Sequence, residues 1–441
     1  MLTTVGFGEA RARTAVLLGF LVLLAYNANL REVSSQDTMP ARLLPVALIR
    51  EGSLTLDMFF RDHPKDAPLP YWVQHANGHY VSGYPLLPAL LALPVYLVPI
   101  RVLGGDSWAL INVLAKLTAS SIAALSVVLV YLALTRLQRD SVALAIAMVY
   151  ALGTSTWSVA SQGLWGHGPA QLFMAAAILC ALAGDDRPVF LDLVGPAAGL
   201  MVAARSITAL LAAALLAYVI RRHPGRGLRA VALFAAVLLP FVAYNLWTFG
   251  TVEGGYTRMH EDFKADGFAG TWVTPLREGL PGLLVSPSRG LFVYSPVLVF
   301  VVAGLVLSLR QPQRRLFFGC LAAGLAASLL TLAKYSLWFG GASFGPRLLT
   351  DFLPALTMFL APAWAALERR RTLRVAATLL FAVSIGVQAV GAFYYPSPRE
   401  VDWNTAPRDV PVRARVWDWN DSQIARLLRN GPRPLGFGPL E

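Results

Sequence analysis

The sequence predicts an all-α polytopic membrane protein. Its 441 residues are 56% hydrophobic and only 14% charged, whereas about 25% of the residues in a soluble domain are charged. Apolar runs such as 15–30 and 291–309 approach the roughly 20 residues that a helix needs to cross a bilayer. A soluble domain of this size is therefore excluded, and we expect helices to form most of the fold.

The apolar runs predict eleven crossings, the first of them an uncleaved N-terminal helix. A signal peptide would begin similarly, but no clear small-residue cleavage site follows the first run, and many more runs come after it. The apolar segment 84–100 contains four prolines, which are poor material for a straight helix. We expect it to lie along the membrane, or to dip into it, on the side of the first loop. The crossings lie near residues 14–30, 107–134, 141–161, 167–184, 189–204, 206–220, 229–249, 290–309, 316–337, 347–367 and 375–394.

The placement of arginine predicts which loops face the cytoplasm. Cytoplasmic loops carry an excess of Lys and Arg, and a cytoplasmic N-terminus puts almost the whole net positive charge on that side. A full crossing by 84–100 would turn every later cluster outward. For the same reason, we expect 189–220 to form two short helices with a tip at Arg205. The basic residues assigned to the cytoplasm are Arg11, Arg13, Arg136, Arg139, Arg187, Arg221, Arg222, Arg226, Arg229, Arg310, Arg314, Arg315, Arg369, Arg370, Arg371 and Arg374.

This topology predicts one transmembrane domain, residues 1–394, followed by an extracytoplasmic C-terminal tail, residues 395–441. The transmembrane domain carries two large extracytoplasmic loops, 31–106 and 250–289. The Arg-rich, Lys-poor composition suggests a GC-rich bacterial genome. We therefore expect a multi-pass protein of the bacterial cytoplasmic (inner) membrane, with its N-terminus in the cytoplasm and its C-terminus outside.

Composition and motifs argue against nucleic-acid and metal partners. The net charge of +12 is divided among short loops between apolar runs, which is the pattern of membrane topology. Cys180 and Cys320 fall inside apolar runs, so no disulfide framework or Cys-based metal site is available. His75 and His79 have the spacing of metal ligands on a helix, but the Asn-Gly pair between them breaks such a helix. We expect no nucleic acid, no metal and no cofactor.

Asp37 is the main candidate for a catalytic residue. It follows a polar stretch and precedes 40-PARLLPVALIREG-52, whose apolar residues recur with helical spacing. A helix lying on the membrane would hold Asp37 at its start, near the lipid headgroups. There its carboxylate could accept a proton from a hydroxyl group. It could equally cap the helix, since Asp is a favoured N-cap, and spacing alone favours capping slightly.

Two arginines are candidates for binding an anion such as a lipid phosphate. Arg205 lies at an intramembrane tip, where a charge is expensive and indicates a functional site. Arg347 stands in 338-WFGGASFGPRLLTDFLP-354, where glycines let the backbone approach a ligand and a helix begins. A guanidinium group at a helix start suits a phosphate. The alternative for Arg347 is an arginine in a tight turn that extends to the membrane surface.

Weaker candidates lie on the same side. Lys334, near the outer end of its helix, could bind an anion or simply extend to the surface. His167, at an outer helix start, could bind a phosphate or a sugar, although an ordinary helix-terminal histidine is the simpler interpretation. Arg289 repeats the pattern of Arg347. The tail segment 415–430 combines two tryptophans with an amphipathic run, which indicates an interfacial helix that covers the outer cavity or anchors the tail.

In these features the chain resembles the GT-C class of integral-membrane glycosyltransferases, in the branch of protein mannosyltransferases and aminoarabinose transferases. The matching features are one span, a long outer loop with an acidic motif (Glu32 and 36-QDT-38), the proline-rich segment 83-GYPLLPALLALP-94 and the FGPR turn at 344–347. Many relatives have adjacent paired acids, whereas these two stand five residues apart. A proline pair of some relatives is replaced here by Ser82-Gly83-Tyr84-Pro85.

The resemblance implies transfer of a sugar from a polyprenyl-phosphate donor to a glycan, lipid or protein acceptor on the outer face. It implies a catalytic acid in the first outer loop, which favours Asp37 as general base, with Glu32 in reserve. Arg205 and Arg347, with Lys334 and His167, would then bind the donor phosphate, and we add Arg42 and Tyr84 to this set. The alternatives are a transporter or flippase of an anionic amphipathic lipid, or a structural subunit of an envelope-polymer assembly.

Overall fold

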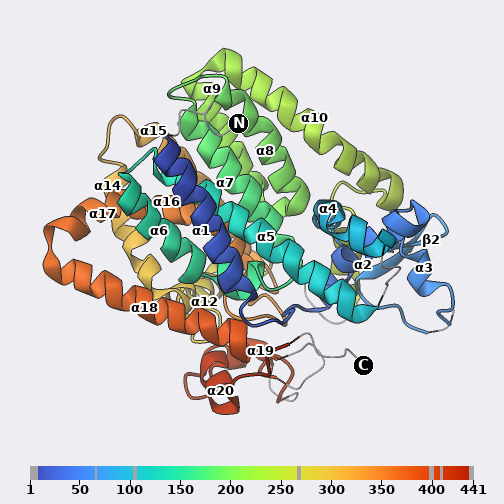
Figure 1. Ribbon diagram of the computed structural model, residues 1–441. Helices are drawn as coiled ribbons and strands as arrows, with labels where there is room; N and C mark the ends of the chain where they lie inside the picture. The colour runs from blue at the N-terminus through green and yellow to red at the C-terminus, as the bar shows by residue number, and fades with distance from the viewer. Residues whose placement is uncertain are drawn as a thin grey trace.

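The fold is a bundle of helices with one small β-hairpin (Figure 1). The computed structural model describes residues 8–64, 67–102, 107–265, 270–396, 402–407 and 411–436. Up to the tip at Arg205 its elements are α1 (Glu9–Asn27), η2 (Gln36–Thr38), α2 (Met39–Glu51), α3 (Asp57–Phe60), β1 (Val73–Ala76), β2 (His79–Ser82), α4 (Leu87–Val102), α5 (Trp108–Leu134), α6 (Asp140–Leu152), η3 (Thr156–Ala160), α7 (His167–Ala183) and α8 (Phe190–Ala204).

The second half of the chain continues the bundle and ends in two short helices. Its elements are η4 (Ser206–Thr208), α9 (Ala209–Arg222), α10 (Pro224–Phe249), α11 (Gly255–Ala265), α12 (Leu276–Val285), α13 (Leu291–Tyr294), η5 (Pro296–Val299), α14 (Phe300–Ser308), α15 (Arg315–Lys334), η6 (Arg347–Phe352), α16 (Leu353–Met358), α17 (Leu360–Arg369), α18 (Arg371–Tyr394), α19 (Val412–Arg415) and α20 (Gln423–Asn430).

Four of the described helices are long and apolar enough to cross a membrane: α5, α10, α15 and α18. A fifth span results if η6–α16 and α17, which meet at a bend of 55°, are counted together. These helices indicate a multi-pass membrane protein, but the expected count of eleven crossings is not confirmed. Several expected spans are short apolar helices instead, among them α6, α7 and α8.

Local sequence explains two of the shortened spans. The expected crossing 141–161 ends as α6 at Leu152, and the chain then forms a single π-helical turn, η3. The expected crossing 290–309 is divided by Pro296, which lacks the N–H that a continuous helix requires, into α13, η5 and α14. The break predicted at Arg205 is confirmed, because this residue has an extended backbone between α8 and η4.

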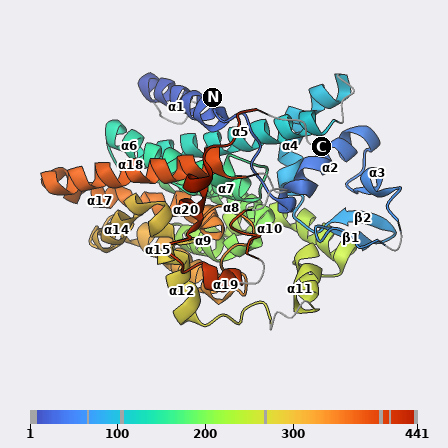
Figure 2. The same cartoon turned by 90° about the horizontal axis from the view of Figure 1, so that it is seen from below.

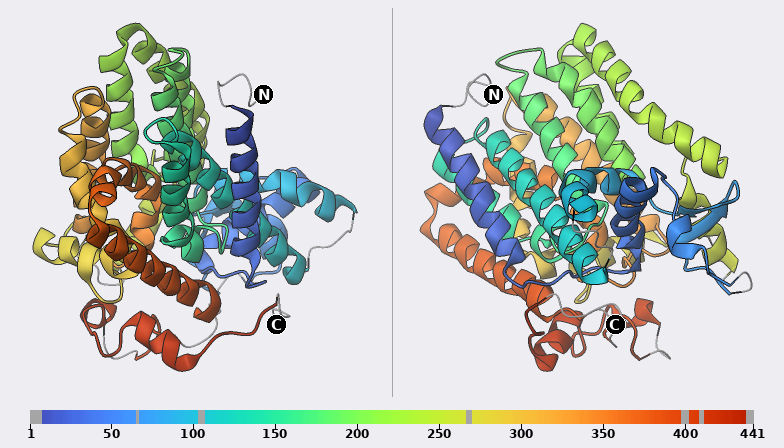
Figure 3. Two further views of the ribbon diagram at one scale, coloured as in Figure 1. Left: turned by 60° about the vertical axis from the view of Figure 1, so that its left-hand side comes forward. Right: turned by 45° about the vertical axis from the view of Figure 1, so that its right-hand side comes forward.

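The described residues between α1 and α5 fold into a compact unit at one side of the bundle (Figure 3). Its antiparallel hairpin pairs Val73 with Ser82 and Ala76 with His79. The Asn-Gly pair that breaks a helix here forms the hairpin turn, since Asn77 and the following glycine both have positive φ, as such turns require. The proline-rich segment, in which we doubted a straight helix, forms the 16-residue α4 and packs on α2.

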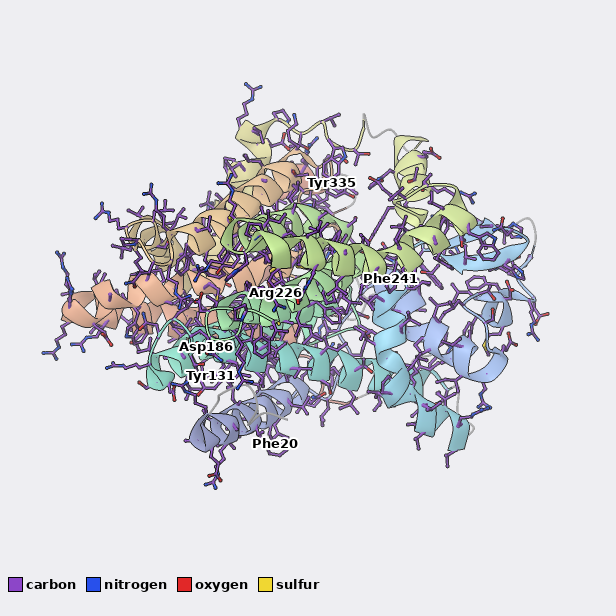
Figure 4. The ribbon with its side chains drawn as sticks, turned by 90° about the horizontal axis from the view of Figure 1, so that it is seen from above. Phe20, Tyr131, Asp186, Arg226, Phe241 and Tyr335 are labelled. Carbon is purple, nitrogen blue, oxygen red and sulfur yellow. The ribbon has the colours of Figure 1, made fainter. Side chains whose placement is uncertain are left out.

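The two ends of the bundle carry different structures. The loop between α9 and α10 lies toward the top of Figure 1, and α19 and α20 lie toward the bottom. Figure 4 views the upper end, where Arg226 pairs with Asp192 at 2.6 Å, and it shows Phe20 on the outward side of α1. Figure 2 views the lower end, where α20 lies against α18. Exposed apolar side chains on α1 and α10 suit contact with lipid.

Helices α8 and α10 approach unusually closely because α8 presents Gly195 and Gly199 to its neighbour. A Cβ atom on Gly195 would lie 2.0 Å from the Ala230 carbonyl oxygen, and one on Gly199 would lie 3.0 Å from the Phe234 oxygen. Small residues four apart are a common means of close helix packing in membranes. This contact sets the position of α8, and therefore of Arg205 at its end.

We expect Gly195→Ala to destabilise the protein by about 1–3 kcal/mol, the usual cost of overpacking, because the Ala230 backbone must move. Gly386→Ala on α18 is the matched control, since its added Cβ meets nothing within 4 Å. The stability of both variants is measured by thermal unfolding of the purified proteins in detergent. Equal unfolding temperatures for the two variants would contradict the close contact.

Candidate functional site

A cavity of about 870 Å³ opens on the side of the bundle that carries the segment between α1 and α5 and the C-terminal tail. Its walls come from distant parts of the chain: the segment 34–37, the start of α9, the end of α15, the turn 340–342 and the tail. Asp37, Arg205 and Arg347 all line it, together with Tyr71 and Tyr84. The structure thus brings the three main candidates from the sequence to one place.

The Asp37 carboxylate faces the cavity and forms an ion pair with Arg347, at 2.5 Å between Oδ2 and Nη1. Its other oxygen accepts a hydrogen bond from the Tyr71 hydroxyl. Ser35 caps the short helix η2 by accepting from the Asp37 N–H, and no side chain caps α2. The interpretation of Asp37 as a helix cap is therefore wrong, because its own backbone is capped by its neighbour.

Opposing effects act on the pKa of Asp37. Burial raises the pKa, while the charge of Arg347 and hydrogen bonds from Tyr71, Arg347 and Tyr84 lower it, and the net result is a pKa below the ordinary value. Burial and the nearby Asp37 charge raise the pKa of Tyr71, so its hydroxyl keeps the proton that it donates. Asp37 is therefore an ionised carboxylate at neutral pH, although it is largely shielded from water.

A glycine-rich turn presents Arg347 to the cavity. Gly340, Gly341 and Gly345 have positive φ, and a Cβ atom at Gly345 would lie 2.5 Å from the Tyr294 ring. Glycine is therefore required at this point of the turn. The guanidinium carbon of Arg347 then lies 4.7 Å from the centre of the Trp165 ring, a cation–π contact that fixes its orientation.

Asp351, which we did not identify from the sequence, holds a second cluster. Its carboxylate is fully buried, and it pairs with Arg205 Nε at 3.2 Å and with His167 Nδ1 at 2.7 Å. The Arg205 guanidinium also reaches the Tyr256 hydroxyl at 3.5 Å. The sequence signal for Asp351 was its position inside the apolar run 348–360, because a carboxylate at membrane depth needs a partner and so indicates a functional site.

The two clusters lie side by side. A small pocket beside the main cavity is lined by Asp37, His167, Arg205 and Arg347, and also by Tyr84. Each arginine is held by one carboxylate and keeps further N–H groups for a ligand. An anion between the two guanidinium groups would lie next to the Asp37 carboxylate. The arrangement can therefore bind a phosphate and place its neighbouring atoms beside a base.

Four other candidates lie elsewhere. Glu32 and Arg42 form a buried pair with 3.7 Å between Oε2 and Nη1, and neither is among the described residues that line the main cavity. Lys334 is half-buried at the end of α15 and is likewise outside that lining. Arg289 is only 1% exposed, and it donates to backbone and side-chain oxygens of the protein itself.

The described residues do not fit a divalent cation at this site. Their His, Cys, Asp and Glu side chains include no group of three that could hold a metal ion. The oxygens of Asp37 already accept from Arg347 and Tyr71. Oxygen-rich cation sites usually gather several carboxylates or carbonyls, whereas here Asp37 and Asp351 each face a guanidinium group.

Comparisons with known proteins identify the fold. No family model matches the sequence, and no curated protein sequence matches it. The oligosaccharyltransferase of Archaeoglobus fulgidus, solved in complex with Zn and sulfate, matches in structure with a TM-score of 0.55 and 14% identity, over 97% of this chain and 58% of that one. The same enzyme, AglB, in complex with an inhibitory peptide and a dolichol-phosphate gives a TM-score of 0.54 and 13% identity, over 98% of this chain and 61% of that one.

A bacterial structure agrees with these two. ArnT from Cupriavidus metallidurans in the apo state matches with a TM-score of 0.53 and 13% identity, over 87% of this chain and 75% of that one. These proteins are GT-C glycosyltransferases, so this chain has a GT-C-like fold, as its sequence predicted. It spans less than two thirds of the length of the oligosaccharyltransferase that it matches.

We expect Arg347→Gln to raise the pKa of Asp37 above the ordinary value of about 3.9, because burial then acts without the opposing charge. In the native protein the pKa of Asp37 is lower than in the unfolded chain, so ionised Asp37 stabilises the fold at any pH above its unfolded pKa. This stabilisation is lost as the pH falls through the lower pKa of the folded protein. In the variant, Asp37 protonates at a higher pH.

Infrared spectra recorded over a pH series would show this as a protonated-carboxyl band that appears at higher pH in Arg347→Gln than in the wild type. The band is assigned to Asp37 if it disappears in Arg347→Gln combined with Asp37→Asn. Arg50→Gln, an exposed arginine on α2, is the control and should leave the titration unchanged. An unshifted band in Arg347→Gln would mean that the ion pair does not control Asp37.

Proposed function

We propose that this protein is a membrane glycosyltransferase that moves a sugar from a polyprenyl-phosphate donor to an acceptor on the extracytoplasmic face. One observation carries the proposal: the ionised Asp37 faces a large cavity beside Arg347 and Arg205. A base and a pair of phosphate-binding groups are what such a transfer needs. The likeness in fold to GT-C glycosyltransferases, one of them solved with a dolichol-phosphate, supports the same class of donor.

In the proposed reaction, Asp37 takes the proton from an acceptor hydroxyl. The acceptor oxygen then attacks the anomeric carbon of the sugar and forms the new glycosidic bond. The bond from this carbon to the phosphate oxygen breaks, and polyprenyl phosphate leaves with the electron pair. Attack from the face opposite the phosphate inverts the anomeric centre. A general base of this kind typically contributes a factor of about 10²–10⁴ to the rate.

Arg205 and Arg347 stabilise the negative charge that grows on the phosphate as it leaves. Preorganised donors of this type are often the largest contribution to catalysis, because they need no reorganisation during the reaction. His167 and Asp351 hold Arg205 in place by their buried contacts. Tyr84 lines the cavity beside Asp37 and is suited to contact the donor. Of the two candidate acids, Asp37 and Glu32, we assign the base to Asp37, because Glu32 pairs with Arg42 away from the main cavity.

Donor binding also activates the base in this scheme. In the free protein, Arg347 lowers the pKa of Asp37, which weakens it as a base. A phosphate competes for the same guanidinium group, and its negative charge raises the pKa of the nearby carboxylate. The proton affinity of Asp37 therefore rises when the donor is present. Partners in this proposal are the lipid-linked donor, membrane lipid and a glycan, lipid or protein acceptor, in the bacterial cytoplasmic membrane.

We expect Asp37→Asn to abolish transfer, so that the polyprenyl-phosphate sugar accumulates in the membrane. Mass spectrometry of membrane lipids from wild-type, deletion and Asp37→Asn strains measures the amount of this lipid-linked sugar. Asp62→Asn, the same change at an exposed position of the same loop, is the matched control and should leave the lipid profile normal.

The outcomes separate the proposed enzyme from its alternatives. Accumulation in both the deletion and Asp37→Asn strains, with normal expression, supports the transferase and identifies its sugar. Accumulation in the deletion alone would favour a transporter or flippase of the lipid, which needs no base. No accumulation in any strain would remove the lipid-linked donor from the proposal.

We expect Arg205→Lys to weaken binding of a short-chain polyprenyl phosphate by about tenfold to a hundredfold, the range for a lost charged hydrogen bond. Lysine keeps a positive charge beside Asp351 but lacks the planar fork that matches a phosphate. Arg101→Gln, an exposed arginine on α4, is the control. Titration calorimetry of the purified protein measures the affinities, and an unchanged affinity in Arg205→Lys would exclude Arg205 as a phosphate ligand.

A further inference from the structure

The C-terminal tail, whose described residues after α18 are 395–396, 402–407 and 411–436, is part of the cavity-bearing face. Its helix α20 lies against α18 at the lower end of the bundle (Figure 2). Tyr395, Asp402 and Thr405 of the tail line the main cavity. Trp403 is 1% exposed, and its indole N–H donates to the Asp421 carbonyl oxygen at 2.7 Å. The tail is therefore a packed element of the site.

Gln423, the first residue of α20, bonds directly to the glycine-rich turn that presents Arg347. Its side chain is fully buried. The amide oxygen accepts from the Gly345 N–H at 2.9 Å, and the amide nitrogen donates to the Ser343 carbonyl oxygen at 2.8 Å. The Gln423 side chain thus provides hydrogen-bond partners for one backbone N–H and one backbone carbonyl group of the turn.

Two neighbours fix the Gln423 amide. Arg289 donates to its oxygen at 2.9 Å, and the Tyr294 hydroxyl donates to the same atom at 3.2 Å. The backbone N–H of Gln423 donates a hydrogen bond to Ser288 Oγ at 3.1 Å. Ser422 caps α20 by accepting from the Ala425 N–H, which sets where the helix begins. The position of the amide is therefore determined from several directions.

Arg289 connects the same two segments a second time. Its guanidinium group donates to the Phe339 and Gly341 carbonyl oxygens of the turn, at 2.5 and 3.0 Å. It also donates to Asn404 Oδ1 of the tail at 2.6 Å, and it lies 4.9 Å from the centre of the Trp403 ring. These contacts occupy the group that we considered as a phosphate ligand, and they give it a structural role instead.

We propose that the tail positions the Asp37–Arg347 pair through Gln423, which is a positioning residue for the reaction. Gly345 is bonded on both sides: its N–H donates to Gln423, and its carbonyl oxygen accepts from the Arg347 N–H at 2.9 Å. The chain of contacts therefore runs from the tail to the turn, from the turn to Arg347, and from Arg347 to Asp37. This inference rests on the proposed function for its catalytic consequence, but its structural part can be tested without any activity.

The test compares the full-length wild type with Gln423→Ala and Gln423→Glu. The glutamate variant keeps an oxygen for Gly345, Arg289 and Tyr294 but loses the donor to Ser343. Asn430→Ala is the matched control, since Asn430 is exposed at the end of the same helix. Two measurements are made on each protein: hydrogen–deuterium exchange of the peptide that covers 338–347, and the pH dependence of kcat/KM for sugar transfer.

We expect exchange in this peptide to accelerate about tenfold in Gln423→Ala, the effect of losing roughly one hydrogen bond, with a smaller change in Gln423→Glu. We also expect the acid limb of the kcat/KM profile to move to higher pH in Gln423→Ala. A less well-held Arg347 lowers the pKa of Asp37 less, so the base protonates sooner as the pH falls. A merely structural contribution of the tail would reduce activity without moving this limb.

Different results contradict the two proposals separately. Unchanged exchange in the turn and an unchanged acid limb in Gln423→Ala would overturn the positioning role. An unmoved limb with faster exchange would overturn its catalytic part. Faster exchange in a protein whose wild type transfers no sugar would leave the tail contact standing and remove the proposed function.

Discussion

The ion pair between Asp37 and Arg347 is the interaction on which the rest of the site depends. It joins two segments that lie 310 residues apart in sequence, the short helix η2 and the start of η6. Taking both charges out of water is costly, and removing one partner of such a buried pair costs about 3–5 kcal/mol. The surrounding structure must therefore hold both groups in good geometry. Tyr71, Trp165 and the tail serve this purpose.

Charge balance explains why the site contains two pairs. Arg205 and Arg347 would repel each other if both were unpaired, and each is held by its own carboxylate, Asp351 or Asp37. The two pairs together carry little net charge, which lowers the cost of burying them. The two carboxylates differ in their surroundings: Asp351 is fully enclosed by Arg205 and His167, while Asp37 faces the cavity. Only the second can meet a substrate.

The sequence predicted the parts of the site that depend on membrane position. Arg205 and Arg347 could be found because a charge near an apolar run is costly and therefore indicates a functional site. Asp37 could be found because it precedes an amphipathic helix. Asp351 offered the same kind of signal, an acid inside an apolar run, and we did not identify it. Gln423 could not be found in this way, since its importance comes from contacts with residues far away in sequence. The count of eleven crossings is not confirmed, for a similar reason. Hydropathy finds apolar segments, but the breaks at η3 and Pro296 depend on local turns and packing.

The same pair also accounts for how a weak base could act in the proposed reaction. A carboxylate with a depressed pKa is a poor proton acceptor, so an isolated Asp37–Arg347 pair would favour stability over catalysis. A donor phosphate that draws the guanidinium toward itself removes part of the attraction that holds the pKa down. The base then becomes effective only when the sugar is present, which limits unproductive proton transfer to water. This coupling requires that Arg347 can reach both partners from one fixed turn, and that requirement gives the bonds from Gln423 to Gly345 and Ser343 their importance.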